Sequence, residues 1–278
     1  MLKTKWIARK RHSKTCISVF FYFKPTADGT TFDIHNMKTY CGANDYDAYN
    51  AIGLLGYANA TTIKNVNNYD VNVNGKHCVG AIVGKSDYES FILQNCRVSG
   101  SVNGYNYVGG VTGLFSGQIL NCVNYVAVKS SQFCVGGIVG QAEYATTITS
   151  SFVDCSITPV STSKVGVIVG NTTVATTITY CGAKVNVTAA ASTVQSFYNA
   201  ASGVTVTCND SYSLVNNNRT QVNRITATSS GMDGKFSRLS TIHDGLPVPL
   251  GIYHTSQYGT TTGIASTLKG SQYGCTTA

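Results

Sequence analysis

The chain has 278 residues, of which 43% are hydrophobic and only 12% are charged. Its formal net charge is +8, but six basic residues lie within the first 14 positions: Lys3, Lys5, Arg9, Lys10, Arg11 and Lys14. The remainder carries 14 basic and 12 acidic residues, a net charge of +2. This nearly neutral body lacks the basic face of a nucleic-acid binder, and no apolar run reaches the roughly 20 residues of a membrane-spanning helix.

The basic N-terminal segment, residues 1–31, has three interpretations. It is an arm for an acidic surface, the positive region of a secretory signal followed by "CISVFFYF" at 16–23, or a cationic tail that leads into a first strand. The apolar stretch of the second interpretation is only eight residues long and includes Ser18 and Tyr22. The segment therefore leaves open whether the chain is secreted, displayed at the cell surface or cytoplasmic.

A glycine-broken hexamer then recurs along residues 32–224. It reads "VGAIVG" from Val79, "VGGVTG" from Val108, "VGGIVG" from Val135 and "VGVIVG" from Val165, with a weaker "AIGLLG" from Ala51. The steps between these starts are 28, 29, 27 and 30 residues. A fixed period of this length is typical of a repeat protein whose units stack on one another.

Each repeat continues with a polar turn and two further short strands. Stretches such as "YDVNVNG" (69–75), "VNYVAVK" (123–129) and "AKVNVTA" (183–189) alternate valine with polar residues, which is typical of a half-buried strand. The repeats lack helical segments and are shorter than a propeller blade. They predict an all-β fold, a single right-handed parallel β-solenoid of about six coils of 27–30 residues.

Stacking predicts that equivalent positions form columns along the solenoid axis. We expect small residues where backbones approach closely, at Gly80, Gly84, Gly109, Gly113, Gly136, Gly140, Gly166 and Gly170. We also expect one column of buried, inert thiols, formed by Cys96, Cys122, Cys155, Cys181 and Cys208.

The C-terminal part changes character. Residues 225–251 are expected to cap the open end of the solenoid, and residues 252–278, rich in Gly, Ser, Thr and Tyr, to form a flexible tail.

The hexamer followed by strands such as "FILQNC" (91–96) and "QILNC" (118–122) resembles the GLUG repeat of surface, adhesin-like and immunoglobulin A protease-like proteins. The resemblance covers roughly residues 51–215, and "DGLPVPL" (244–250) looks like the sequence that closes such arrays. It implies a structural or adhesive module without catalytic residues, possible membership of a longer array, and surface glycans or proteins as partners.

Candidate ligand contacts lie in the turns of the repeats. Asp87 and Glu143 each lie eight residues after a hexamer start, and Tyr88 and Tyr144 follow them. Tyr105 and Tyr107 precede another hexamer. These six residues predict a surface that binds carbohydrate or protein.

Two other functions remain open. The carboxylates of Asp87 and Glu143, two coils apart, have a separation close to that of inverting glycosidases, so a polysaccharide-cleaving enzyme is one alternative. An intracellular scaffold that docks through its basic N-terminus is the other. No C-x-x-C pair and no grouped histidines occur, so we expect neither a metal nor another cofactor.

Overall fold

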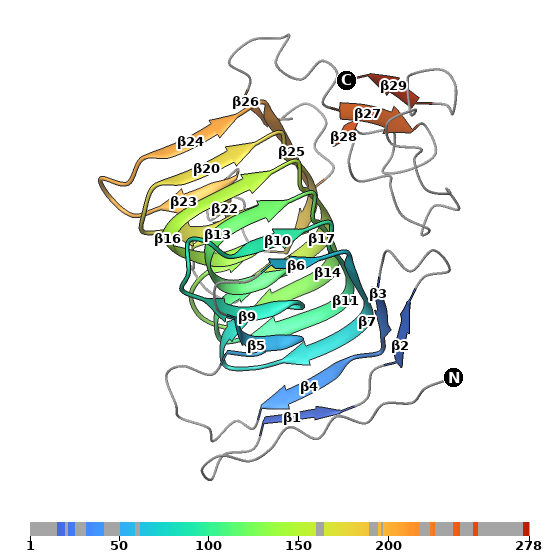
Figure 1. Ribbon diagram of the computed structural model, residues 1–278. Coiled ribbons are helices and arrows are strands. Elements are labelled where there is room, and N and C mark those ends of the chain that lie inside the picture. The colour runs from blue at the N-terminus through green and yellow to red at the C-terminus, as the bar shows by residue number, and fades with distance from the viewer. Residues whose placement is uncertain are drawn as a thin grey trace.

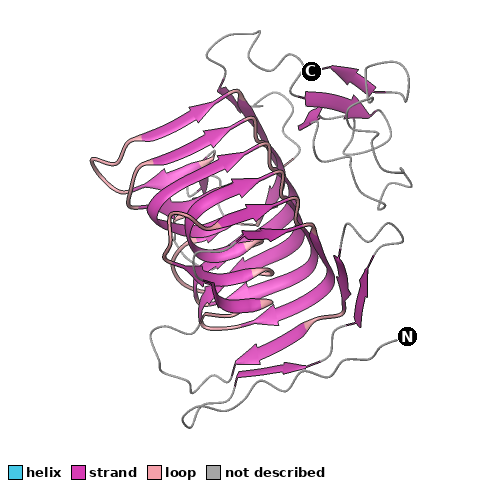
Figure 2. Ribbon diagram, in the orientation of Figure 1, coloured by secondary structure: helices cyan, strands magenta, loops and turns pink. Residues whose placement is uncertain are grey.

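The computed structural model describes the central part of the chain nearly continuously. The described residues are 16–19, 22–25, 32–41, 51–58, 62–159, 164–188, 194–195, 197–216, 223–225, 236–239, 247–249 and 275–277. They form strands joined by short turns, as Figure 2 shows. Within these ranges there is no helix of sufficient length and hydropathy to cross a membrane.

Three sheets of stacked strands make up the body (Figure 1). Sheet 1 has 11 strands: β1 (Cys16–Val19), β2 (Tyr22–Pro25), β3 (Phe32–His35), β4 (Lys38–Cys41), β7 (Val66–Asn74), β11 (Arg97–Gly104), β14 (Val123–Ser130), β17 (Phe152–Pro159), β21 (Gly182–Val187), β25 (Ser211–Val215) and β26 (Asn223–Ile225). Sheet 2 has 10 strands: β5 (Leu55–Ala58), β6 (Thr62–Lys64), β9 (Val83–Ser86), β10 (Ile92–Gln94), β13 (Thr112–Leu120), β16 (Val139–Thr149), β19 (Val169–Thr172), β20 (Thr176–Thr179), β23 (Tyr198–Ala200) and β24 (Val206–Asn209). Sheet 3 has five short strands: β8 (His77–Val79), β12 (Asn106–Gly109), β15 (Val135–Gly136), β18 (Val165–Gly166) and β22 (Val194–Gln195).

Each coil visits the three sheets in the same order. The coil of β12, for example, continues through β13 in sheet 2 to β14 in sheet 1, and the next coil repeats this path with β15, β16 and β17. Strands of successive coils pair in parallel, as β11 does with β14 and β14 with β17. The prediction of an all-β parallel β-solenoid is confirmed, with about 5 turns.

Additional antiparallel strands lie near both ends of the chain. β1 pairs with β4, β2 with β3, and β26 with β25. A separate sheet consists of β27 (Phe236–Leu239), β28 (Pro247–Pro249) and β29 (Cys275–Thr277). Most of the predicted N-terminal segment 1–31, cap 225–251 and tail 252–278 lies outside the described residues, so these boundaries stay predictions.

The solenoid interior consists of columns of aliphatic side chains. In sheet 2 the register aligns Ile63, Leu93, Ile119, Ile148 and Ile178 from successive coils. In sheet 1 the predicted alternation is confirmed, because Val126 and Val128 are buried whereas Ala127 and Lys129 are exposed. Burial of each such side chain contributes roughly 1.5–3 kcal/mol. The interior therefore stabilises a stack of coils that could not fold singly.

The hexamer glycines allow backbone to pack on backbone. A Cβ atom on Gly113 would collide with the Cys78–Val79 peptide of the preceding coil, and one on Gly140 with the Tyr107–Val108 peptide. Gly84 and Gly170 have equivalent backbone contacts. The predicted close approach at the closing glycine is confirmed. The weak first hexamer is shifted only at its start, where Ile52 rather than Ala51 bridges to Val79, whereas Leu55 pairs with Val83 at the expected step.

The prediction of a single cysteine column is wrong, as the register between paired strands shows. Cys96, Cys122 and Cys181 do occupy one column, and Ser151 fills the coil between the last two of them. Cys155 instead pairs with Val185 in sheet 1 and is only partly buried, contrary to the prediction. Cys208 takes the place of isoleucine next to Ile178. The sequence position near the end of a strand was a poor guide because loop lengths differ between coils.

The asparagines that directly precede Val66, Cys96 and Cys122 have a left-handed backbone conformation. Asn65, Asn95 and Asn121 have φ values of 60°, 54° and 53°. Asparagine tolerates this conformation better than most residues. The side chains also form a ladder, because Asn121 Nδ2 donates to Asn95 Oδ1 at 3.3 Å and Asn95 Nδ2 donates to Asn65 Oδ1 at 3.1 Å. This ladder fixes one corner of the solenoid.

Candidate binding surface

The loop edge is the part of sheet 2 where the coils differ most. We use this name for residues 86–91, 115–117 and 143–145. Phe115 pairs with Ala142 and Gly117 with Thr146, so three residues of one coil lie opposite one residue of its neighbour. Likewise, Leu114 pairs with Lys85 but Gln118 pairs with Ile92. Among the extra residues, Tyr88, Glu89, Tyr144 and Ala145 are exposed.

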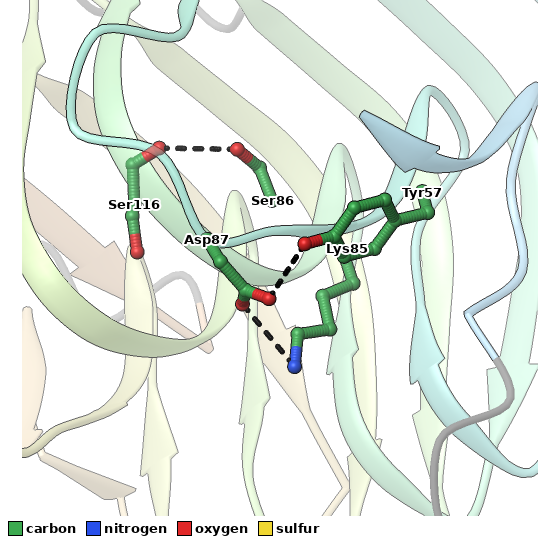
Figure 3. A network of polar contacts seen from close by, with 5 residues as sticks. All are labelled: Tyr57, Lys85, Ser86, Asp87 and Ser116. Atoms are coloured by element: carbon green, nitrogen blue, oxygen red, sulfur yellow. Dashed lines mark hydrogen bonds and ion pairs between the residues drawn. The ribbon is translucent and has the colours of Figure 1, made fainter. Parts of the chain in front are cut away.

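A polar network centred on Asp87 anchors this edge (Figure 3). Asp87 Oδ1 lies 3.2 Å from Lys85 Nζ, and the Tyr57 hydroxyl donates to Asp87 Oδ2 at 2.9 Å. This hydrogen bond raises the pKa of Tyr57, with smaller contributions from desolvation and from the Asp87 charge. Burial acts to lower the pKa of Lys85, but the hydrogen bond and charges of Asp87 and Glu143 outweigh it, so that the pKa is raised. Lys85 therefore remains a cation under physiological conditions.

The next coil contributes short or apolar side chains. Leu114 pairs with Lys85 and is only 4% exposed, and Ser116 is completely buried. The main-chain oxygen of Ser116 accepts a hydrogen bond from Ser86 Oγ at 3.5 Å (Figure 3). Ser116 Oγ has no hydrogen-bond partner within the described part of the chain. A buried hydroxyl without a partner is costly, and is a feature found at functional sites.

One coil further on, Gln141 and Glu143 bring polar side chains back to the edge. Gln141 pairs with Leu114, and its Oε1 accepts from Asn171 Nδ2 at 3.1 Å and from Cys134 Sγ at 3.5 Å. Glu143 is half-buried. Its charge contributes to the raised pKa values of Lys85 and Tyr107, so it lies within electrostatic range of both.

Tyr107 and Cys78 flank these side chains from sheet 3. Both have left-handed backbones, with φ of 52° and 49°, which is uncommon for such residues. Their neighbours Val108 and Val79 pair directly, so the two residues occupy adjacent coils. Burial raises the pKa of Tyr107, with smaller contributions from Cys134, Cys78 and Glu143. Tyr107 is therefore positioned between the two polar coils.

The structure brings most of the predicted ligand contacts together. Asp87, Tyr88, Glu143 and Tyr144 lie on the loop edge, where Tyr88 and Tyr144 are 42% and 48% exposed. Tyr107 lies in β12, in the coil between those that carry Asp87 and Glu143.

Tyr105 differs from these residues. It lies in the turn between β11 and β12, and its ring stands edge-on to that of His77 with a centroid distance of 6.2 Å. Asn106 Nδ2, at the start of β12, lies 3.1 Å from Nδ1 of its strand partner His77 in β8. Burial lowers the pKa of His77, with a smaller contribution from Lys76. We assign Tyr105 to this separate turn.

Sequence reasoning missed three polar contributors: Tyr57, Lys85 and Gln141. A signal was available, because Tyr57, Lys85, Leu114, Gln141 and Asn171 follow one another at steps of 28, 29, 27 and 30 residues. These are the same steps that separate the hexamer starts. Aligning every position by the hexamer would have placed these five side chains in one column.

Burial raises the pKa of several thiols, both within the predicted column and outside it. Burial raises the pKa of Cys78 to about 12 and that of Cys134 to about 11. Burial is also the main cause that raises the pKa of Cys181 to about 12. Thiols with such pKa values are poor nucleophiles near neutral pH. Within the described ranges, no group of three or more His, Cys, Asp or Glu residues is arranged to hold a metal ion.

A comparison with solved structures gives a match of low similarity. The chain is similar to a crystal structure of a "putative immunoglobulin A1 protease" from Bacteroides ovatus, with a TM-score of 0.40 and 15% sequence identity. The match covers 81% of this chain and 94% of that chain. No protein-family model matches the sequence, and a comparison with curated proteins gives no relative. The resemblance to the GLUG repeat thus stays one of sequence pattern.

Proposed function

We propose that the chain is a non-enzymatic structural and adhesive β-solenoid module of a cell-surface or secreted protein. In this proposal the solenoid is a rigid support, and the loop edge contacts a carbohydrate or protein partner. The observation that carries the proposal is the presence of three exposed tyrosines beside two carboxylates. Tyr57, Tyr88 and Tyr144 are 51%, 42% and 48% exposed, and they belong to different coils.

Physical chemistry supports a binding role for such an edge. Tyrosine offers a large, rigid and amphipathic surface at a low entropic cost, because its side chain has few rotatable bonds. Loops of variable length on a rigid scaffold are the usual place for binding residues. The resemblance of the hexamer and the "ILQNC"-type strands to the GLUG repeat supports an adhesive module rather than a catalytic one.

The test is binding of the intact protein to whole cells and to extracellular matrix. The double variant Tyr88→Ala/Tyr144→Ala is expected to lose at least tenfold in affinity, because both side chains are exposed and contribute little to folding. Phe133→Ala is the matched control, since Phe133 is 52% exposed but lies in the turn before β15, outside the loop edge. Unchanged binding of the double variant would contradict the proposal.

The two alternatives make different predictions. A polysaccharide-cleaving enzyme would show turnover that Asp87→Asn abolishes, although Asp87 is held by Lys85 and Tyr57. An intracellular scaffold would show a salt-sensitive interaction that is lost when residues 1–14 are deleted. That basic segment lies outside the described residues.

A further inference from the structure

The sequence carries five Asn-x-Ser/Thr sequons, which form the acceptor pattern for N-linked glycans. Three of them, at Asn171, Asn186 and Asn209, lie within the described part of the chain. The other two, at Asn59 and Asn218, lie outside it. A glycan is bulky and hydrophilic, so a folded chain accommodates one only where the asparagine side chain reaches solvent. The three described sequons differ in this respect.

The sequon at Asn171 is part of the contact between two coils. Asn171 pairs with Gln141, is only 2% exposed, and its Nδ2 donates to Gln141 Oε1 at 3.1 Å. The sequon hydroxyl, Thr173 Oγ1, donates to the main-chain oxygen of Ala142 at 3.3 Å. A sugar on Asn171 Nδ2 would need space that the packing of β16 against β19 already fills. The folded chain therefore excludes a glycan at this position.

The sequon at Asn209 is built into a corner of its coil. Asn209 is half-buried, and the hydroxyl-bearing residue Ser211 is completely buried. Ser211 Oγ donates to the main-chain oxygen of Asn209 at 2.8 Å and accepts a hydrogen bond from Cys181 N at 3.0 Å. In the folded chain the hydroxyl that completes this sequon is thus withdrawn from solvent.

The sequon at Asn186 has the opposite character. Asn186 and Thr188 are both exposed, whereas Val187 between them is buried. Because side chains alternate between the two faces of a strand, the amide and the hydroxyl lie together on the outer face of sheet 1. Within the described residues, neither side chain makes a hydrogen bond. Both polar groups of this sequon are therefore available to solvent.

The strand ladder around Asn186 is open toward the following coil. β25 pairs with β21 only as far as Val185. The following coil then turns at Asn216, which has a φ of 53° and whose Oδ1 accepts from Val187 N at 2.7 Å. Within the described residues, no strand of that coil pairs with Asn186. On the other side Asn186 pairs with Ser156, whose side chain is short. The surroundings thus leave room for a large group on the Asn186 side chain.

From these differences we propose that Asn186 is the acceptor of an N-linked glycan, with an oligosaccharide carried on a lipid diphosphate as the donor. Asn186 Nδ2 attacks the anomeric carbon of the first sugar and forms a carbon–nitrogen bond. The carbon–oxygen bond to the diphosphate breaks, the lipid diphosphate leaves with the electron pair, and Nδ2 loses one proton to a base of the transferase. This inference goes beyond the adhesive function but rests on the proposed location at the cell surface or outside the cell.

The first experiment tests the site independently of the natural location of the chain. The full chain is secreted from a eukaryotic host with an added cleavable secretion signal, and its glycans are released by an amidase that converts each glycosylated asparagine to aspartate. Peptide mass spectrometry is expected to find the conversion at Asn186 and not at Asn171. Thr188→Val is expected to abolish it, and Thr188→Ser, which preserves the sequon, to retain it. An unmodified Asn186, or a glycan on Asn171 of the folded chain, would overturn the inference and leave the adhesive function standing.

The second experiment applies the same mass spectrometry to the protein from its own cells, after fractionation. A glycan on Asn186 of a surface or secreted chain is the expected result. A surface or secreted chain without that glycan means that the inference is wrong and the proposed location is right. A chain found only in the cytosol, without the glycan, means that the inference and the proposed location are both wrong.

Discussion

The hexamer corner and the loop edge are built from the same coils, yet they follow opposite rules. At the hexamer corner, Gly113, Gly140 and Gly170 hold equivalent positions, and each packs against the backbone of a neighbouring segment. At the loop edge, the same coils insert different numbers of residues and expose Tyr88 or Tyr144. Uniform positions specify how the coils stack, whereas variable positions are available for contacts with other molecules.

The largest effect is expected from an added side chain at the hexamer corner. Gly140→Ala places a Cβ atom against the Tyr107–Val108 peptide, where backbone cannot move aside cheaply. We expect a loss of about 3 kcal/mol or more in the free energy of unfolding, at the upper end of overpacking effects. Urea denaturation measures it.

Gly203→Ala is the control for that change. Gly203 has a positive φ of 80° but nothing within 4 Å of the added atom. Only backbone strain is introduced there, at a cost of about 1–2 kcal/mol. If the two alanines cost the same, the collision at Gly140 is not what makes the hexamer glycine necessary.

A smaller effect separates two cysteines that the sequence grouped together. Cys122→Ser is expected to cost less than about 1 kcal/mol, because Ser151 holds the same position in the next coil and donates to Thr149 O at 3.1 Å. Cys155→Ser is expected to cost about 1–3 kcal/mol, because its position is one of the valine positions of sheet 1. Thermal unfolding of the two variants measures the difference, and equal losses would contradict the corrected columns.

The buried thiols also predict how stability depends on pH. Burial raises the pKa of Cys181 from 9.0 in the unfolded chain to about 12. The folded state then holds the thiol proton more tightly than the unfolded chain does. The contribution of Cys181 to the free energy of unfolding is therefore complete below pH 9 and decreases as the pH rises toward 12. Cys181→Ser is expected to reduce the slope of unfolding free energy against pH in this window. An unchanged slope would mean that this thiol does not contribute.

The smallest effect on stability is expected at the loop edge. Asp87→Asn removes a half-buried ion pair with Lys85 and the charged acceptor of the Tyr57 hydroxyl. We expect a loss below about 1 kcal/mol in the free energy of unfolding, since ion pairs that solvent still reaches contribute little. The pKa of Tyr57 should fall toward its ordinary value, which a spectrophotometric titration compared with Tyr57→Phe detects. A large loss of stability would show that the edge is structural.

The repeat period was sufficient to predict the solenoid, because a unit that cannot bury its own apolar face must stack. The same period did not place Cys155 and Cys208, since loops of unequal length shift a residue relative to its neighbours. Asp87 and Glu143 were predicted from their distance to the hexamer. Lys85 and Tyr57, the partners of Asp87, follow the same steps as the hexamers and could have been aligned from the sequence. The hydrogen bond from Ser86 to the main chain of Ser116 joins coils whose loops differ in length, so it required the structure.

Native-state amide hydrogen exchange, resolved by residue, tests the contrast between the two regions most directly. The amides of Ile138 and Ile168, which bond to Ile168 O and Phe197 O in the next coil, are expected to exchange only through global unfolding. Amides of Tyr88, Glu89 and Tyr144 are expected to exchange by local opening, many times faster. If the hexamer amides exchanged as fast as those of the loop edge, the coils would not stack through the hexamer, and the account would be wrong.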